Sequence, residues 1–167
     1  PLSALQSLAA YWRSQHSVEV IGITGSLGKT TTKELIASVL SLRFSVLKSE
    51  GNLNTEIGLP LSLLRLEPYH QIAVLEMGMY DLGEIAMLCR IAKPSVGVVT
   101  NVGPVHLERL GTIYNIATAK AELAESLPED GHAILNGEDP LVRAMASRTK
   151  AKVLLYGHDQ SFDLWAD

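Results

Sequence analysis

The sequence has 167 residues, which is the size of one domain with a single hydrophobic core. Hydrophobic residues make up 47% of the chain and charged residues 19%, a composition that argues against disorder and suits a sheet buried on both faces. The formal net charge of -4 disfavours nucleic acid and anionic membranes as partners, so any phosphate site has to be local. We therefore expect one domain over 1–167.

Cysteine usage and hydropathy indicate a cellular compartment. The single cysteine, Cys89, lies in a helix-like apolar pattern and has no partner for a disulfide, which fits a reducing environment. No apolar run reaches the length of a membrane span, and the start lacks the regions of a signal peptide. We expect a cytoplasmic protein. Because the sequence begins with Pro1 and its last residues resemble the start of a strand, we also expect a piece of a longer protein.

Short β-branched runs alternate with longer helical patterns, which predicts repeated βαβ units. The predicted strands are 18–24, 44–49, 71–77, 95–102, 132–136 and 152–157. The predicted helices are 29–42, 55–66, 82–92, 112–127 and 138–148. The strand runs are apolar without alternation, so we expect an α/β fold with a mostly parallel sheet flanked by helices. Ligands of such sheets bind beyond the carboxyl ends of the strands.

The first predicted strand runs through "TGSLGKTT" into a helix, which is the pattern of a phosphate-binding loop. Glycines let backbone N–H groups approach an anion, and the helix N-terminus adds a positive dipole. We expect Lys29 to reach the terminal phosphates of a nucleotide and the Thr30 hydroxyl to bind Mg²⁺. The expected phosphate-binding residues are Gly25, Ser26, Leu27, Gly28, Lys29, Thr30 and Thr31.

The loop departs from the common form G-x-x-x-x-G-K-[ST], because Ile23 stands five residues before Gly28. Strand, loop and helix nevertheless agree, so the fold class is expected to be P-loop NTPase-like. No Asn-Lys-x-Asp motif follows a strand, which disfavours a GTPase.

Three further side chains are candidate metal ligands. Glu76 ends the apolar strand 71–77, where a carboxylate beside a P-loop usually holds the magnesium of the nucleotide; a solvated or helix-paired glutamate is the alternative. His106 follows the next strand, and the residues alone favour a surface or structural histidine. For Lys120, in the predicted helix 112–127, a solvated lysine is favoured, since an ammonium repels Mg²⁺. Only conversion to a carbamate by CO₂ would make Lys120 an anionic ligand.

Taken in order, several segments resemble the central domain of the Mur ligase family, and the resemblance covers essentially the whole chain. These segments are "GITGSLGKTTTKELI", "GNLNTEIGLPLSLL", "LEMGM", "TNVGPVHLERLG", "ATAKAEL" and "ILNGEDP". The second segment is similar to the members that add D-alanyl-D-alanine. The resemblance implies an ATP-dependent amide ligase of peptidoglycan precursor synthesis, which acts on UDP-N-acetylmuramoyl-tripeptide and D-alanyl-D-alanine through an acyl phosphate.

The resemblance also implies roles for residues. Thr30 and Glu76 would hold a first Mg²⁺, and Glu76, His106 and carbamylated Lys120 would hold a second one. Lys29, Glu76, His106 and Lys120 would form the catalytic set. For Asn52 and Asn54, contact with the muramoyl-peptide is favoured over helix capping, whereas for Thr55 the two alternatives are equal. Asn101 would orient a phosphate or tie its loop.

No His-Asn-x-x-Asn pattern, which helps to hold the nucleotide in the family, occurs in the sequence. We therefore expect an ATP-binding central domain that is incomplete at its C-terminal end, is inactive by itself, and lacks the N- and C-terminal domains of the same chain. Two alternatives stay open. One is a non-catalytic nucleotide-binding module, and the other is a related Mur or folylpolyglutamate-type ligase with another substrate.

Overall fold

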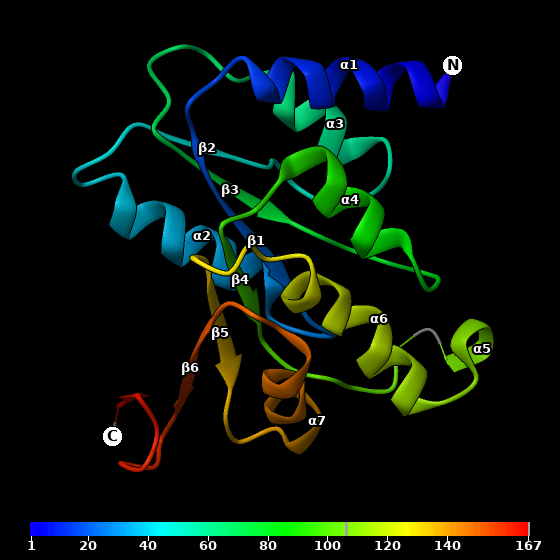
Figure 1. Cartoon of the computed structure of the whole chain (residues 1–167), viewed down its shortest axis with the longest axis vertical. Helices are drawn as coiled ribbons and strands as arrows, with labels where there is room; N and C mark the ends of the chain where they lie inside the picture. The colour runs from blue at the N-terminus through cyan, green and yellow to red at the C-terminus, as the bar shows by residue number, and fades with distance from the viewer. Residues whose placement is uncertain (106, 167) are drawn as a thin grey trace.

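The computed structural model describes residues 1–105 and 107–166, which form one sheet covered by helices (Figure 1). The sheet has seven strands in the order β2-β3-β1-β4-β5-β6-β7, and every neighbouring pair is parallel. The strands are β1 Glu19–Thr24, β2 Val46–Lys48, β3 Ile72–Glu76, β4 Val96–Val99, β5 His132–Asn136, β6 Lys152–Gly157 and β7 Leu164–Trp165. The expected parallel α/β fold is confirmed.

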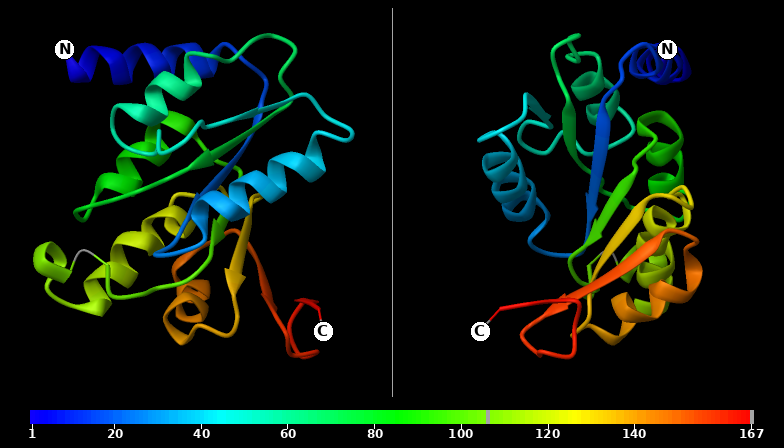
Figure 2. Two further views of the ribbon diagram at one scale, coloured as in Figure 1. Left: turned by 180° about the vertical axis from the view of Figure 1, so that it is seen from behind. Right: turned by 60° about the vertical axis from the view of Figure 1, so that its left-hand side comes forward.

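Helices cover both faces of the sheet unequally (Figure 2). The α-helices are α1 Leu2–Ser14, α2 Lys29–Leu40, α3 Gly58–Leu63, α4 Glu84–Ala92, α5 Leu107–Leu110, α6 Ile113–Glu125 and α7 Pro140–Arg143, and a 3₁₀ helix follows at Ala144–Arg148. Helix α2 packs on one face, where its Ala37 joins Ile23 and Val74 in a small apolar cluster. The other face carries the larger cluster, to which α1, α3, α4, α6 and α7 contribute.

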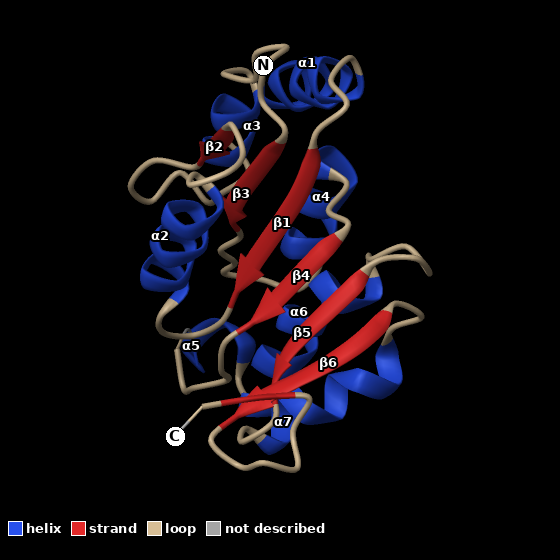
Figure 3. Ribbon diagram, turned by 90° about the vertical axis from the view of Figure 1, so that its left-hand side faces the viewer, coloured by secondary structure: helices blue, strands red, loops and turns tan. Residues whose placement is uncertain are grey.

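Strand β3 shows why this sheet needs apolar runs. It lies between β2 and β1, both of its faces are covered, and every one of its residues is buried. A buried strand removes apolar side chains from water on both sides, which is the main source of stability for such a sheet. The strand ends at Glu76, a buried carboxylate beside the carboxyl end of β1. The carboxyl ends of β1, β3 and β4 therefore meet beside the start of α2 (Figure 3).

The main differences from the predicted elements are two helices that were not predicted, α1 and α5, and two predicted helices that have different bounds. Helix α1 lies outside the predicted elements, and tertiary contacts anchor it: the Trp12 indole donates to the Leu66 carbonyl, and the Arg13 guanidinium to those of Ala92 and Val18. The predicted helix 55–66 is shorter at both ends, because residues 55–57 form a bend and a turn before α3, and α3 ends at Leu63. The predicted helix 138–148 tightens from α7 into a 3₁₀ helix at Ala144.

Candidate active site

The P-loop connects β1 to α2 through two glycines whose backbone no other residue adopts easily. Gly25 has φ +152°, and a Cβ there would lie 1.9 Å from the Thr100 hydroxyl oxygen. Gly28 has φ +79° and is the N-cap of α2. The Thr32 N–H donates to the Gly28 carbonyl at 2.9 Å, so the N–H groups of 28–31 precede the hydrogen-bonded part of the helix. They form a cradle at the positive end of the helix dipole, an arrangement that suits an anion.

The loop after β4 holds the P-loop in place. The Asn101 side chain accepts a hydrogen bond from Leu27 N–H at 2.8 Å and donates to the Leu27 carbonyl at 3.0 Å. The Ser26 N–H donates to the Asn101 carbonyl at 3.0 Å, and the Gly103 N–H donates to the Ser26 hydroxyl at 2.7 Å. Of the two interpretations of Asn101, the observed contacts therefore favour the tie between loops.

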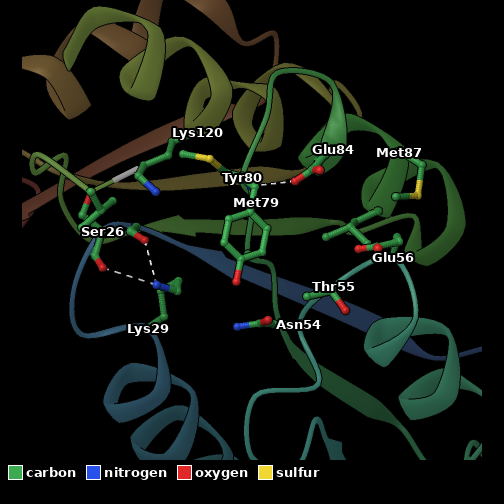
Figure 4. Close-up of a pocket in the computed structure, with 14 residues that line it drawn as sticks. Ser26, Lys29, Asn54, Thr55, Glu56, Met79, Tyr80, Glu84, Met87 and Lys120 are labelled. Atoms are coloured by element: carbon green, nitrogen blue, oxygen red, sulfur yellow. Dashed lines mark hydrogen bonds between the residues drawn. The ribbon is translucent and has the colours of Figure 1, made fainter. Parts of the chain in front are cut away.

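Two lysines approach the cradle from facing sides (Figure 4). The Lys29 ammonium donates to the Gly25 carbonyl at 3.0 Å. Lys120 comes from α6 and is only 3% exposed. Burial, followed by the nearby charge of Lys29, lowers the pKa of Lys120 from 10.5 to about 7. The positive charge at this end of the pocket suits an anion, and the lowered pKa leaves part of Lys120 as a neutral amine near neutral pH.

Glu76 is the centre of a hydrogen-bonded group at the end of β3. Its Oε2 accepts from the Thr30 hydroxyl at 2.9 Å, and its Oε1 accepts from the Asn54 amide at 2.7 Å. Its backbone N–H donates to the Ser49 hydroxyl at 3.1 Å. The carboxylate is 3% exposed, and no ion pair joins it to a described residue. A buried carboxylate without a cation is costly, so this donor set fits a bound cation.

The oxygens of Thr30 and Glu76 are spaced so that both could bind one Mg²⁺ ion. Neighbouring oxygens of an octahedral Mg²⁺ shell lie about 2.9 Å apart, and Thr30 Oγ1 and Glu76 Oε2 are separated by 2.9 Å. Within 1–105 and 107–166 there is no group of three or more His, Cys, Asp or Glu that could hold a metal ion. The predicted ligand His106 lies outside the described residues.

A cavity of about 120 Å³ extends from the P-loop along the segment after β3. Its phosphate end is formed by Gly25, Ser26 and Lys29, and Lys120 lines it from α6. Its other side is a wall that α4 and the residues before it provide. The lining residues of this wall are Gly78, Met79, Tyr80, Glu84, Met87 and Leu88. A ligand bound to the P-loop would therefore reach a mixed polar and apolar surface.

Only part of the asparagine segment 51–55 lines the pocket. Asn54 lines the pocket, and its carbonyl accepts from the Gly78 N–H at 2.8 Å, which fixes the segment to the end of β3. Thr55 also lines the pocket, while its hydroxyl accepts from the Gly58 N–H at 3.3 Å at the start of α3. Asn52 is exposed, and its carbonyl accepts from the Asn54 N–H.

Two buried charges near the site are absent from the sequence analysis. Lys33, on α2, is fully buried and donates to the Gly51 carbonyl at 3.4 Å, which ties the asparagine segment to the helix of the P-loop. Glu122, on α6, accepts from the backbone of α4. The available signal for Glu122 was a charge between Ala121 and Leu123 in an apolar stretch. Its two partners are 39 and 36 residues away, so these contacts depend on the fold.

Comparison with known proteins decides the family. The model of the Mur ligase middle domain matches residues 23–167. The chain belongs to this family. No helix within the described part of this Mur ligase middle domain is long and apolar enough to cross a membrane.

Relatives of this middle domain are amide ligases. The UDP-N-acetylmuramoyl-tripeptide–D-alanyl-D-alanine ligase of Synechocystis sp. is 48% identical over 157 residues, which cover 93% of this chain and 35% of that protein. A crystal structure of MurF from Acinetobacter baumannii matches with a TM-score of 0.90 and 37% identity, covering 94% of this chain and 35% of that one. MurF of Thermotoga maritima in complex with ADP matches with a TM-score of 0.88 and 41% identity, covering 95% and 37%. The chain thus spans about a third of the length of these relatives.

Proposed function

We propose that this chain is the ATP-binding middle part of a ligase that joins D-alanyl-D-alanine to UDP-N-acetylmuramoyl-tripeptide. The observation that carries the proposal is the contact between Thr30 and Glu76 at the end of a P-loop, beside a pocket that Lys29 and Lys120 line. That arrangement suits the joining of two anions, a nucleotide phosphate and a carboxylate. The substrates come from the relatives, which are named as ligases of this tripeptide and dipeptide.

The reaction has two displacement steps. In the first, a carboxylate oxygen of the tripeptide attacks the γ-phosphorus of ATP, the bond from that phosphorus to the bridging oxygen breaks, and ADP leaves with the electron pair. In the second, the amine of D-alanyl-D-alanine attacks the acyl carbon, the bond to the phosphate oxygen breaks, and the nitrogen loses a proton. The products are an amide, ADP and phosphate.

The residues of this chain bind and orient the reacting groups. The N–H groups of 28–31 and the Lys29 ammonium bind the phosphates of the nucleotide and balance their charge. Thr30 and Glu76 would hold Mg²⁺, which when bound supplies positive charge to the transferring phosphoryl group. The wall after β3 would contact the acyl substrate, because the attacking carboxylate has to lie in line beyond the γ-phosphate.

Glu76, His106 and a carbamate of Lys120 would hold a second Mg²⁺. The carbamate forms when the neutral amine of Lys120 attacks the carbon of CO₂ and loses a proton, which replaces a cation by an anionic oxygen ligand. Two features support this step. Lys120 lines the phosphate end of the pocket, and its pKa of about 7 leaves a substantial share of the amine neutral at neutral pH.

The test is a phosphate-release assay on the full-length protein with MgATP, the tripeptide substrate and D-alanyl-D-alanine. We expect release that depends on the dipeptide, that falls at least about a hundredfold in Lys120→Ala, and that a short carboxylic acid partly restores by replacing the carbamate. Lys150→Ala, which removes an exposed lysine, serves as the control and keeps full activity. Dipeptide-independent release in the wild type would contradict the proposal.

The two alternatives make different predictions in this assay. A nucleotide-binding module would bind MgATP without releasing phosphate in response to any acyl substrate. A related ligase would release phosphate with another amino acid or peptide in place of D-alanyl-D-alanine. The contact between Thr30 and Glu76 is expected of a binding module and of a ligase alike, because both would bind MgATP, so the dependence of phosphate release on the dipeptide distinguishes them.

A further inference from the structure

We propose that Glu122 is a positioning residue of this ligase, which holds the pocket wall after β3 at a fixed separation from Lys120. The inference rests on the proposed function, because that function gives the wall its substrate. Glu122 itself does not line the pocket. It lies two residues after Lys120 on the same helix, α6.

The Glu122 carboxylate is buried and bonded to the backbone of another helix. Its Oε1 accepts from the Gly83 N–H at 2.6 Å, and its Oε2 accepts from the Ala86 N–H at 2.9 Å. The residue is 9% exposed, and no ion pair among the described residues includes it. The observed partners of this buried anion therefore both belong to the start of α4.

Helix α4 needs this partner because it has no cap of its own. Its N-cap is Gly83, at φ +85°, so no side chain at that position can accept a hydrogen bond from the first turn. The first N–H groups of a helix have no intrahelical acceptor, and the dipole places positive charge there. A carboxylate from a neighbouring helix satisfies both needs, and its hydrogen bonds are stronger than those of a neutral cap.

The same helix end shapes the wall of the pocket. Glu84, in the first turn of α4, accepts from the Tyr80 N–H at 2.6 Å, which folds the preceding segment onto the helix. Tyr80, Glu84 and Met87 all line the pocket (Figure 4). Because α6 is a rigid element that carries both Glu122 and Lys120, the two bonds of Glu122 set where this wall stands relative to Lys120.

The nucleotide end of the pocket is held by other contacts. The P-loop is fixed by Asn101 and Gly103, through hydrogen bonds to Leu27 and Ser26, and none of these involves Glu122. Loss of Glu122 should therefore displace the wall for the acyl substrate and leave the phosphate cradle in place. An effect on the binding of the acyl substrate but not of the nucleotide would distinguish positioning from a general loss of stability.

The test compares KM values of the full-length enzyme for its two substrates. In Glu122→Ala we expect the KM for UDP-N-acetylmuramoyl-tripeptide to rise about tenfold, while the KM for ATP stays within about twofold. Glu122→Gln keeps an acceptor oxygen of the same reach, so it should recover part of the loss. If Glu122→Ala does not fold, the same two KM values are compared between the wild type and Glu122→Gln. Equal changes in both KM values, or no change in either, would overturn the proposal.

Two matched variants separate positioning from charge and stability. Glu125→Ala removes a carboxylate from the same helix, one that bonds Arg148 at the surface, and should leave both KM values unchanged. Val142→Ala opens a cavity in the hydrophobic core at α7, at a residue that does not line the pocket, and should cause a comparable loss of stability. If Val142→Ala reproduces the selective rise in the KM for the tripeptide, Glu122 has no positioning role.

Amide hydrogen exchange of the free full-length protein gives a readout that does not need the reaction. Glu122→Ala should lose protection at the Gly83 and Ala86 N–H groups. It should keep protection at the Leu27 N–H, which donates to the Asn101 side chain. Unchanged protection at Gly83 and Ala86 would overturn the inference. A wild-type enzyme that fails to ligate would contradict the proposed function instead, and the exchange result would still decide whether Glu122 holds the wall.

Discussion

Gly25 and Gly28 both have positive φ, yet alanine should affect them differently. At Gly28 nothing lies within 4 Å of an added Cβ, so Gly28→Ala should cost only the left-handed strain of about 1 kcal/mol. At Gly25 the Cβ would meet the Thr100 hydroxyl, which is held by its bond to the Leu27 carbonyl at 2.7 Å. We expect Gly25→Ala to lose about 3 kcal/mol, because overpacking adds to the strain.

Urea unfolding of both variants and their affinities for MgATP check this prediction. Gly25→Ala should show the larger loss of stability and a weakened nucleotide affinity, since the P-loop has to move away from the loop after β4. Equal losses at the two positions would contradict the packing argument.

Lys120 makes a prediction about pH. Its pKa is lowered from 10.5 to about 7 by burial and by Lys29, so between these values the unfolded chain binds more protons than the folded one. The free energy of unfolding should therefore rise with pH from about 7 to 10.5 relative to a variant without the lysine, and the destabilisation by the buried ammonium is present in full below pH 7.

The measurement is the difference in unfolding free energy between the wild type and Lys120→Met in buffers free of CO₂, where no carbamate forms. The difference should move in favour of the wild type as pH rises through the window and stay flat below it. A difference that is flat throughout, or that moves in favour of Lys120→Met, would contradict the assignment of Lys120 as a desolvated amine.

Sequence motifs were sufficient to place residues that depend on neighbouring elements of the chain. The P-loop and Glu76 could be predicted because a strand, a turn and a helix start are neighbours in the chain. The bond from Asn54 to Glu76 spans 22 residues and that from Glu122 to Gly83 spans 39, so both depend on how helices and strands pack. No spacing in a single sequence encodes such pairings.

At the scale of elements, Asp139 connects a helix cap to the site. Its Oδ1 accepts from the Leu141 and Val142 N–H groups at the start of α7, and its Oδ2 accepts from the Val102 N–H at 2.7 Å, in the loop that holds the P-loop. Asp139→Ala should therefore cost about 2 kcal/mol of stability, from the lost cap and the unsatisfied N–H groups. It should also weaken MgATP binding.

Thr112→Ala is the matched control for that variant. Thr112 caps α6 by accepting from the Asn115 N–H, and it has no observed hydrogen bond to the P-loop or to the loop after β4. Its loss should therefore cost about 1 kcal/mol of stability without a change in nucleotide affinity. Chemical denaturation and calorimetric titration with MgATP measure both quantities. An unchanged affinity for MgATP in Asp139→Ala would show that the loop after β4 does not need the hydrogen bond from Val102 to Asp139.

The strands were the most predictable elements, because buried parallel strands are apolar throughout, and their observed positions agree with the runs read from the sequence. Helix α1 was missed although it contributes Ala9 to the core. Its position depends on the bonds of Trp12 and Arg13 to carbonyls far along the chain, which local propensity does not reveal. The helix predicted at 55–66 lost its first residues to turns that place Asn54 and Thr55 in the pocket.

At the scale of the molecule, the sheet order brings together the ends of β1, β3 and β4, and with them the P-loop, Glu76 and the loop that clamps the P-loop. Helix α6 then contributes Lys120 from the chain after β4. Four segments that are distant in sequence thus form one site, which the sequence analysis could place at one edge of the sheet but could not assemble.

The central claim is that the full-length protein activates the tripeptide carboxylate by phosphoryl transfer and then forms an amide with D-alanyl-D-alanine. Its most direct test uses UDP-N-acetylmuramoyl-tripeptide labelled with ¹⁸O in that carboxylate, with mass spectrometry of the products. The proposed reaction predicts one ¹⁸O atom in the released phosphate for each amide formed. Unlabelled phosphate, or phosphate released without the amide, would contradict it.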